Sequence, residues 1–263
     1  MITAVVTGIG LSMMDRCLTS INPFPDEVIV VMDDIGRMHA EQSDLVSADH
    51  LKRRHPQIKM LHNRNHNNWQ YTNQTINIGI EAAKNDWVCV IHEDTDWSGS
   101  CYFLLAERFL GFERSMSKVS WETYPISDGI HFPIFQMTDV EEGRQKEPYY
   151  DHDCMTQQYG PTSTIFRKSI WCDMGGFKED SGIWYDMELQ EYLVANDLWL
   201  YYHECPPIKH WPSLTYRANN WAGAWSKAPL WGNSGVRHVE KYGHEFTRTR
   251  PGMEIEEWLN RKP

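Results

Sequence analysis

The residues best placed to do chemistry lie in the segment 92–96, which reads His-Glu-Asp-Thr-Asp. Directly before it, residues 87–91 form an apolar run without helical periodicity, typical of a strand buried on both faces of a parallel sheet. Ligands of open α/β sheets bind outside the carboxyl ends of the strands, so Glu93, Asp94 and Asp96 are expected to line a substrate crevice. Carboxylate oxygens suit Mg²⁺ or Mn²⁺, and such an ion can hold a diphosphate. The alternative is an acidic turn that caps the next helix.

Two earlier segments resemble this strand pattern. Residues 2–7 predict the first strand, and Gly8 and Gly10 follow it. These glycines are only a fragment of a glycine-rich phosphate loop, so a tight turn is favoured there over a dinucleotide site. Residues 27–32 predict another doubly buried strand, which stops at Asp33. Carboxylates therefore follow two of the predicted strands.

Helices between these strands give the pattern of an open α/β sheet. Residues 71–84 place Ile76 and Gly79 at helical spacing, which supplies a narrow face able to pack on a sheet. Before this helix, an amide-rich loop with Asn65 and Trp69 could hydrogen-bond a ribose or base, although such loops are more often turn chemistry. Further helices are expected at 11–18, 38–54, 101–112 and 236–242, strands at 57–61, 118–124, 129–136 and 198–203, and a polar loop at 139–153.

The composition excludes several classes of protein. With 263 residues and 41% hydrophobic content, the chain can bury the core of one large α/β domain. A net charge of -11 argues against a nucleic-acid binder, which needs a basic surface. The six cysteines form no CxxC pair, which indicates reduced thiols, and no segment has the apolar length of a membrane span. The sequence therefore predicts a cytoplasmic protein without nucleic-acid partner or membrane span.

The segment 75–84, with the buried strand and acidic end that follow it, resembles the nucleotide-sugar-binding half of GT-A glycosyltransferases, especially family two. Ile76 replaces the arginine usual in that family. Counting from Gly79 puts the family's Asp-x-Asp metal motif on 92–94, with His92 in place of the first aspartate, whereas Asp94-Thr95-Asp96 has the required letters two residues later. Both registers contain Asp94, so the resemblance implies Asp94 as the first metal ligand and Asp96 as the second.

A second, independent segment resembles the same family. Residues 170–179 are similar to its Gly-Gly-Phe-Asp-Glu turn, and residues 184–189 to the Glu-Asp-x-Asp-Leu that opens its acceptor-side helix. Aligned on the leucine, Asp186 falls on the catalytic aspartate and Tyr185 replaces the preceding glutamate. Residues i and i+2 lie on different helical faces, so we prefer Asp186 as the base and keep Glu188 as the second candidate. The alternative role for Asp186 is a helix N-cap.

His210 also resembles a family residue, a histidine after the last core strand that approaches the diphosphate or its metal. A zinc site with His203 and Cys205 is the alternative, but it lacks a fourth ligand and leaves the acidic residues unexplained. The tryptophans that follow either floor an acceptor sugar subsite or pin the tail to the core: Trp211, Trp221, Trp225 and Trp231.

The resemblance implies an α/β, GT-A type (Rossmann-like) fold with a mostly parallel central sheet flanked by helices. One glycosyltransferase domain is expected at 1–215, with a nucleotide-sugar half at 1–98 and an acceptor half at 99–215. Residues 216–263 are expected to form a helical extension packed on it. The implied activity is metal-dependent, inverting transfer of a hexose, with UDP-glucose favoured as donor, to a carbohydrate or other hydroxyl acceptor. A nucleotidyltransferase and a non-catalytic nucleotide-sugar-binding module remain alternatives.

In this reading Mn²⁺ or Mg²⁺ is the cofactor, held by Asp94, Asp96 and His210. Asp186, with Glu188 as second choice, deprotonates the acceptor hydroxyl. The candidates for binding the nucleotide sugar come from the ends of the predicted strands, from the amide-rich loop and from the helix after it: Thr7, Gly8, Asp33, Asn65, Asn77 and Glu93.

Overall fold

The computed structural model describes most of the first half of the chain and separate segments of the second half. The described residues are 1–10, 12–21, 25–34, 45–64, 71–99, 102–109, 127–137, 143–145, 150, 152–157, 163–178, 185–211 and 252–261. The predictions at 118–124 and 236–242 lie outside these ranges, as do Asn65, Trp69, Trp221, Trp225 and Trp231.

Strands and helices alternate through the N-terminal half and are mixed more irregularly afterwards. The strands are β1 Ile2–Gly8, β2 Glu27–Asp33, β3 Lys59–Asn63, β4 Trp87–His92, β5 Thr95–Asp96, β6 Gly129–His131, β7 Ile134–Met137, β8 Gly143–Gln145, β9 Cys154–Thr156, β10 Thr164–Arg167, β11 Leu200–Tyr202 and β12 Ile208–His210. The helices are α1 Ser12–Ser20, α3 Ala48–Arg54, α4 Tyr71–Ala82, α5 Tyr102–Phe109, α6 Lys168–Asp173, α7 Tyr185–Ala195 and α11 Ile255–Arg261.

An eight-stranded sheet in the order β3-β2-β1-β4-β10-β6-β11-β9 forms the centre of the fold. Strands β3, β2, β1 and β4 are all parallel, and so are β6 and β11. Strand β10 runs antiparallel between β4 and β6, and β9 runs antiparallel at the edge. The expected α/β architecture with a mostly parallel central sheet is confirmed.

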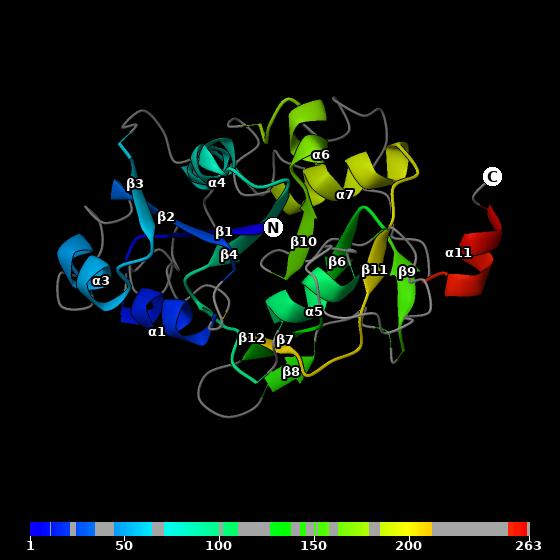
Figure 1. Cartoon of the computed structure of the whole chain (residues 1–263), viewed down its shortest axis with the longest axis horizontal. Helices are drawn as coiled ribbons and strands as arrows, with labels where there is room; N and C mark the ends of the chain where they lie inside the picture. Colours follow the sequence, from blue (N-terminus) through cyan, green and yellow to red (C-terminus); the bar gives the residue numbers. More distant parts are fainter. Residues whose placement is uncertain are drawn as a thin grey trace, which may run out of the picture.

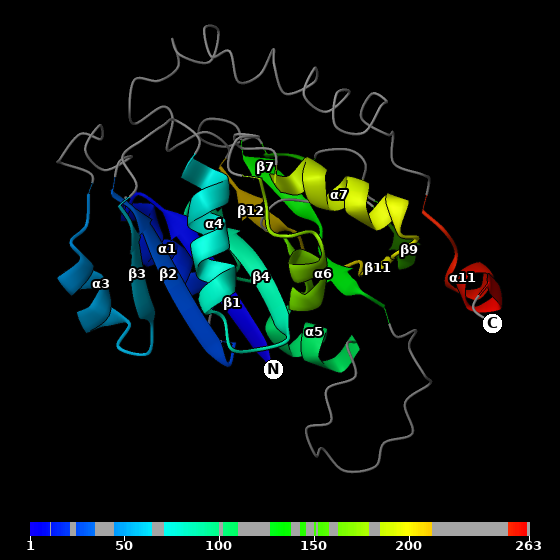
Figure 2. The ribbon, with the colours of Figure 1, turned by 90° about the horizontal axis from the view of Figure 1, so that it is seen from above.

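Side chains on the two faces of this sheet belong to two separate hydrophobic clusters. In β1, Ala4 and Val6 face a cluster that includes α1, α3 and α5, whereas Val5 faces a cluster that includes α4, α6 and α7. Figure 1 shows α4, α6 and α7 on one side of the sheet and α1 and α5 on the other. Seen from above in Figure 2, α4, α6 and α7 lie over the strands. Burial on both faces explains why the core strands are apolar throughout and not alternating.

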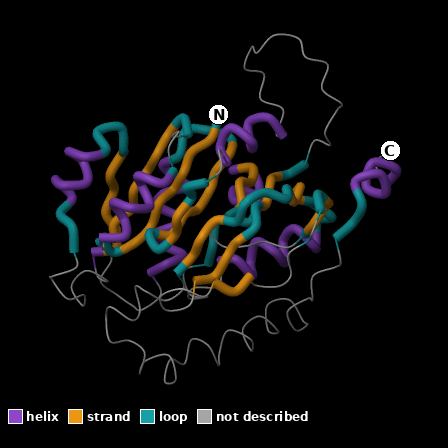
Figure 3. The backbone as a smooth tube through the Cα atoms, turned by 90° about the horizontal axis from the view of Figure 1, so that it is seen from below, coloured by secondary structure: helices purple, strands orange, loops and turns teal. Residues whose placement is uncertain are grey.

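A second, four-stranded sheet in the order β5-β12-β7-β8 lies beside the first. Figure 1 shows β12, β7 and β8 together in the lower part of the view, and Figure 3 shows the strands of the molecule in orange from below. One strand was expected at 129–136, but β6 and β7 belong to different sheets. The chain changes sheet at Pro133, which cannot donate to a ladder. The expectation of a polar loop throughout 139–153 is wrong at 143–145, because β8 pairs with β7 there.

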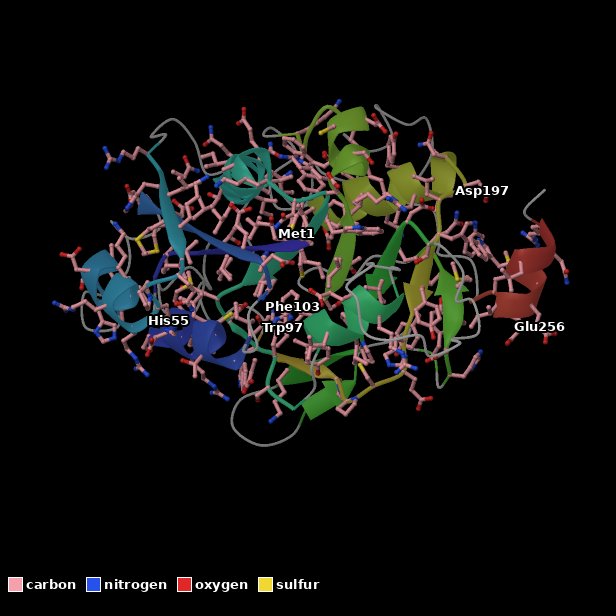
Figure 4. The ribbon with its side chains drawn as sticks, viewed as in Figure 1. Met1, His55, Trp97, Phe103, Asp197 and Glu256 are labelled. Carbon is pink, nitrogen blue, oxygen red and sulfur yellow. The ribbon has the colours of Figure 1, made fainter. Side chains whose placement is uncertain are left out.

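Two further contacts tie peripheral parts to the core. Trp97, directly after β5, stacks on Phe103 of α5 with ring centroids 5.3 Å apart, and both rings are labelled in Figure 4. At the other end, Met253 pairs with Met155 of β9 through two backbone hydrogen bonds, and Trp258 of α11 is buried in the same cluster. Within the described ranges, no helix has both the length and the apolar character that a bilayer crossing needs.

Helix α4 sits unusually close to the sheet at Gly79. A Cβ atom at this position would stand 2.2 Å from Val5 Cγ1 and 3.1 Å from Val31 Cγ2. Val5 and Val31 are fully buried in β1 and β2, so neither can turn into solvent. The absence of a side chain at Gly79 therefore fixes the height of α4 above the sheet.

Replacing Gly79 tests this packing. We expect Gly79→Ala to lower the free energy of unfolding by about 1–3 kcal/mol, because overpacking costs more than the helix propensity of alanine returns. Denaturant unfolding measures the difference. The control is Glu81→Ala at an exposed position of the same helix, which should stay within about 0.5 kcal/mol of wild type. A Gly79→Ala protein as stable as that control would contradict the close contact.

Candidate functional site

The carboxyl ends of the parallel strands meet at one edge of the central sheet. Thr7 of β1 pairs with His92 of β4, and Thr7 O accepts a hydrogen bond from the amide of Glu93 at 3.1 Å. Asp33 ends β2 beside Asn63 of β3. Thr7 and Asp33 thus lie at the predicted edge, where a ligand of an open α/β sheet binds.

At this edge His92, Asp94 and His210 come together, each offering one ligand atom within 4.8 Å of the others. Asp94 Oδ1 lies 3.4 Å from His210 Nε2. Asp94 is only 6% exposed, and its Oδ1 has no hydrogen-bond partner. A buried carboxylate oxygen without a partner is costly, and a cation between these three groups would remove the cost. The arrangement therefore fits a divalent metal ion.

The pairing of two short strands brings His210 to this place. His210 of β12 pairs with Thr95 of β5, and the next amide, Trp211 N, donates to Asp94 O at 2.9 Å. The Trp211 ring, partly buried, packs against the Arg16 guanidinium, whose carbon is 4.5 Å from the ring centroid. Backbone hydrogen bonds thus hold Asp94 and His210, which are far apart in sequence, at a fixed separation.

His92 contacts the start of helix α7. The Tyr185 hydroxyl lies 3.0 Å from His92 Nε2, and the two rings meet edge to face. Burial lowers the pKa of His92 to about 4; the Asp94 carboxylate opposes this shift and His210 adds to it. At neutral pH the imidazole is therefore uncharged and keeps the lone pair that a metal ligand needs.

Glu93 bonds to the loop after β1. Its carboxylate accepts hydrogen bonds from Ile9 N at 2.9 Å and Gly10 N at 3.0 Å, and it is 1% exposed. A Cβ on Gly8 would stand 2.3 Å from Glu93 Cδ. Both predicted nucleotide-binding residues are thus used in holding this loop, which agrees with the tight turn favoured for Gly8.

Asp96 lies apart from the cluster of His92, Asp94 and His210. Its Oδ2 is 2.9 Å from Arg16 Nη2, and its Oδ1 accepts a hydrogen bond from Ser98 N at 2.9 Å. Burial tends to raise the pKa of Asp96, but the hydrogen bonds from Ser98 and the Arg16 guanidinium hold it below its usual value. The structure therefore gives Asp94 and Asp96 different partners.

The two acids of α7 also differ. Asp186 is half-buried and directly follows Tyr185, whose hydroxyl contacts His92. Glu188 is 7% exposed, and its Oε2 accepts a hydrogen bond from Lys178 N at 3.0 Å. Glu188 thus supports the turn before the helix, whereas Asp186 is the second residue of α7, which begins at Tyr185.

Asn77 joins the two segments that resemble family two. Its Nδ2 donates to Phe177 O at 2.7 Å, and its Oδ1 accepts from Phe177 N at 2.9 Å and Trp171 Nε1 at 3.0 Å. These bonds occupy the side-chain amide that was predicted to bind the nucleotide sugar. Asn77 therefore locks helix α4 to the glycine-rich turn.

The alternative zinc site is not assembled among the described residues. His203 Nδ1 faces the Asp153 carboxylate at 3.2 Å, and no group of potential ligands there includes Cys205. In contrast, sequence reasoning did not assign His92 and Tyr185 to the site. The available signal was that both replace acidic residues of the family pattern, at positions that the fold brings into contact.

Comparisons with known proteins agree with this architecture. No family model matches the sequence, and no curated protein matches it. Among solved structures, TarS 1-349 of S. aureus aligns with a TM-score of 0.55 and 13% identity, covering 92% of this chain and 72% of that one. Its complex with UDP gives 0.55 and 12%, covering 91% and 72%. A longer TarS structure gives 0.56 and 12%, with 90% of this chain but 43% of that one. This likeness to a glycosyltransferase of GT-A-like fold shows that the chain has the GT-A type of fold.

Proposed function

We propose that this protein is a metal-dependent glycosyltransferase that moves a hexose, with inversion, from a nucleotide diphosphate sugar to a hydroxyl acceptor. The observation that carries the proposal is the buried Asp94 Oδ1, which has no hydrogen bond and lies beside two histidines at the carboxyl end of β4. The fold likeness to TarS, one structure of which is a complex with UDP, supports a nucleotide sugar as donor. We favour a UDP-hexose, and UDP-glucose among these.

In this proposal the chain's residues divide the work between two sides of the crevice. Asp94 and His210 hold Mn²⁺ or Mg²⁺, which when bound stabilises the charge that develops on the leaving nucleoside diphosphate. Thr7 and Asp33 lie at the same sheet edge, on the side of the nucleoside. Asp186, at the start of α7, accepts the proton of the acceptor hydroxyl.

The first prediction concerns the donor. Thermal unfolding with UDP-, GDP- and dTDP-sugars, with and without Mn²⁺, should show the largest rise in Tm for a UDP-sugar with the ion. A ligand that binds only the folded state stabilises it by about 2.7 kcal/mol at one hundred times its Kd. The absence of any rise with every sugar and ion would remove the donor assignment. Release of pyrophosphate would indicate a nucleotidyltransferase instead, and binding without turnover a non-catalytic module.

The second prediction separates Asp94 from Asp96. Asp94→Asn should abolish transfer and the Mn²⁺ dependence of UDP binding, because it removes the charge of the carboxylate proposed to hold the ion. The matched control is Asp96→Asn, which breaks an ion pair with the half-exposed Arg16 and should cost at most about 1 kcal/mol of stability. Metal-dependent binding of UDP, followed by calorimetry, should persist in that control. The reverse pattern would move the metal site to Asp96.

The third prediction concerns the base. Asp186→Asn keeps the size and a capping oxygen but removes basicity, so turnover should fall by about two orders of magnitude or more while donor affinity stays near wild type. Glu188→Gln should mainly lower stability and have a smaller effect on turnover, because the Glu188 carboxylate accepts a structural hydrogen bond from Lys178 N. Steady-state kinetics and Tm values of both variants test this. Normal turnover in Asp186→Asn with an inactive Glu188→Gln would exchange the two roles.

A further inference from the structure

His92 stands between the acceptor-side helix and the other two members of the cluster. Its Nε2 lies 3.0 Å from the Tyr185 hydroxyl, and one of its ring nitrogens belongs to the group with Asp94 and His210. Tyr185 is 1% exposed and also packs edge to face on Phe177. The hydroxyl therefore reaches His92 from a ring that is itself fixed in the core.

A hydrogen bond to one imidazole nitrogen sets what the other nitrogen can do. When the Nε2–H of the neutral His92 ring donates its hydrogen bond to the Tyr185 oxygen, the lone pair of the ring lies on Nδ1 and is available to a metal ion. Such outer partners commonly fix the tautomer and orientation of metal-binding histidines. Tyr185 can therefore prepare His92 as a ligand without touching the ion.

The ligand set that results has a distinct chemistry. It contains two imidazole nitrogens and one carboxylate oxygen, from His92, His210 and Asp94. Mg²⁺ prefers sites made of oxygen, whereas imidazole suits first-row transition ions, whose affinities generally rise from Mn²⁺ through Co²⁺. With an aspartate at position 92, as in the family pattern, His210 would supply the one nitrogen ligand of the set and the other two ligand atoms would be carboxylate oxygens.

We propose that His92, positioned by Tyr185, is the third protein ligand of the metal ion, and that this set selects Mn²⁺, Co²⁺ or Zn²⁺ over Mg²⁺. The inference rests on the metal requirement of the proposed function and narrows the choice of metal ion. It makes Tyr185 a positioning residue, which acts on the ion through His92.

Metal binding to the full-length protein tests the selectivity without any nucleotide. The EPR signal of free Mn²⁺ reports binding, and pulsed EPR of bound Mn²⁺ detects coordinated imidazole nitrogen. We expect Co²⁺ or Zn²⁺ to displace Mn²⁺ at comparable concentrations and Mg²⁺ to require an excess of about tenfold or more. Displacement by equimolar Mg²⁺, or bound Mn²⁺ without nitrogen coupling, would overturn the proposal.

Variants separate the roles of the two residues. Tyr185→Phe keeps the ring but removes the hydroxyl, and should weaken Mn²⁺ binding by about 10- to 100-fold. The matched control is Tyr201→Phe in β11. Tyr201 is also buried, and its hydroxyl donates a hydrogen bond to Asp153. This variant should bind Mn²⁺ as the wild type does. His92→Asp should reduce the preference for Zn²⁺ over Mg²⁺. If Tyr185→Phe lowers Tm as the control does but binds Mn²⁺ normally, Tyr185 is only structural.

The outcome is distinguishable from that of the function itself. Selective metal binding with no response to any nucleotide sugar would keep this inference and reject the glycosyltransferase proposal. Transfer activity supported equally by Mg²⁺ and Mn²⁺, with equal affinity for both ions, would keep the glycosyltransferase proposal and reject the inference about metal selectivity.

Discussion

The candidate site depends on the short antiparallel pairing between β5 and β12. This pairing joins Thr95 to His210, and the hydrogen bond from Trp211 N to Asp94 O extends it by one step. Without these backbone contacts, the turn after β4 would have no fixed relation to the end of the second sheet. The distance between Asp94 and His210 is therefore a property of backbone pairing, which tolerates side-chain change better than a contact made by side chains alone.

The acids after β4 show how a crowded negative segment can be accommodated in a buried place. Glu93 bonds to the amides of the loop after β1, Asp96 pairs with Arg16, and Asp94 alone of the three keeps an oxygen without a hydrogen bond. Each carboxylate has a different environment, although they lie within four consecutive positions. Because buried charges require compensation, the carboxylate oxygen that lacks a hydrogen bond is the basis for proposing Asp94 as a metal ligand.

Much of the fold could be predicted because the core strands are long and apolar on both faces. The second sheet could not, because its strands β5, β8 and β12 contain only 2, 3 and 3 residues and show no periodicity. Strand β3 begins at Lys59, two residues after its expected start. Of the helix expected at 38–54, residues 48–54 form α3, Ser47 caps it, and residues 45–47 are not helical.

The candidate site residues also fall into those that the sequence could suggest and those that it could not. Asp94, His210 and Asp186 were predicted because they stand at the ends of strands or near a helix start and match a family pattern, and the structure brings Asp94 and His210 together. Asn77 and Glu93 have side chains that suit a ligand, but these bond to the protein backbone, and residue type alone cannot distinguish the two uses. The contact of Tyr185 with His92 joins residues far apart in sequence, so their two departures from the family pattern did not by themselves show that the side chains meet.

The turn after α6 has a mechanical consequence for the whole molecule. Its backbone at Lys178 is bonded on both sides: the amide donates to Glu188 of α7, and the carbonyl accepts from Asn73 of α4. A hinge rotation of the half at 1–98 against the half at 99–215 would have to break the bond from Asn73 together with those of Asn77, at about 0.5–1.5 kcal/mol each, while the bond to Glu188 holds the turn to α7 within the second half. The two halves are therefore expected to behave as one rigid body, and opening the crevice by rotating them apart is energetically unfavourable.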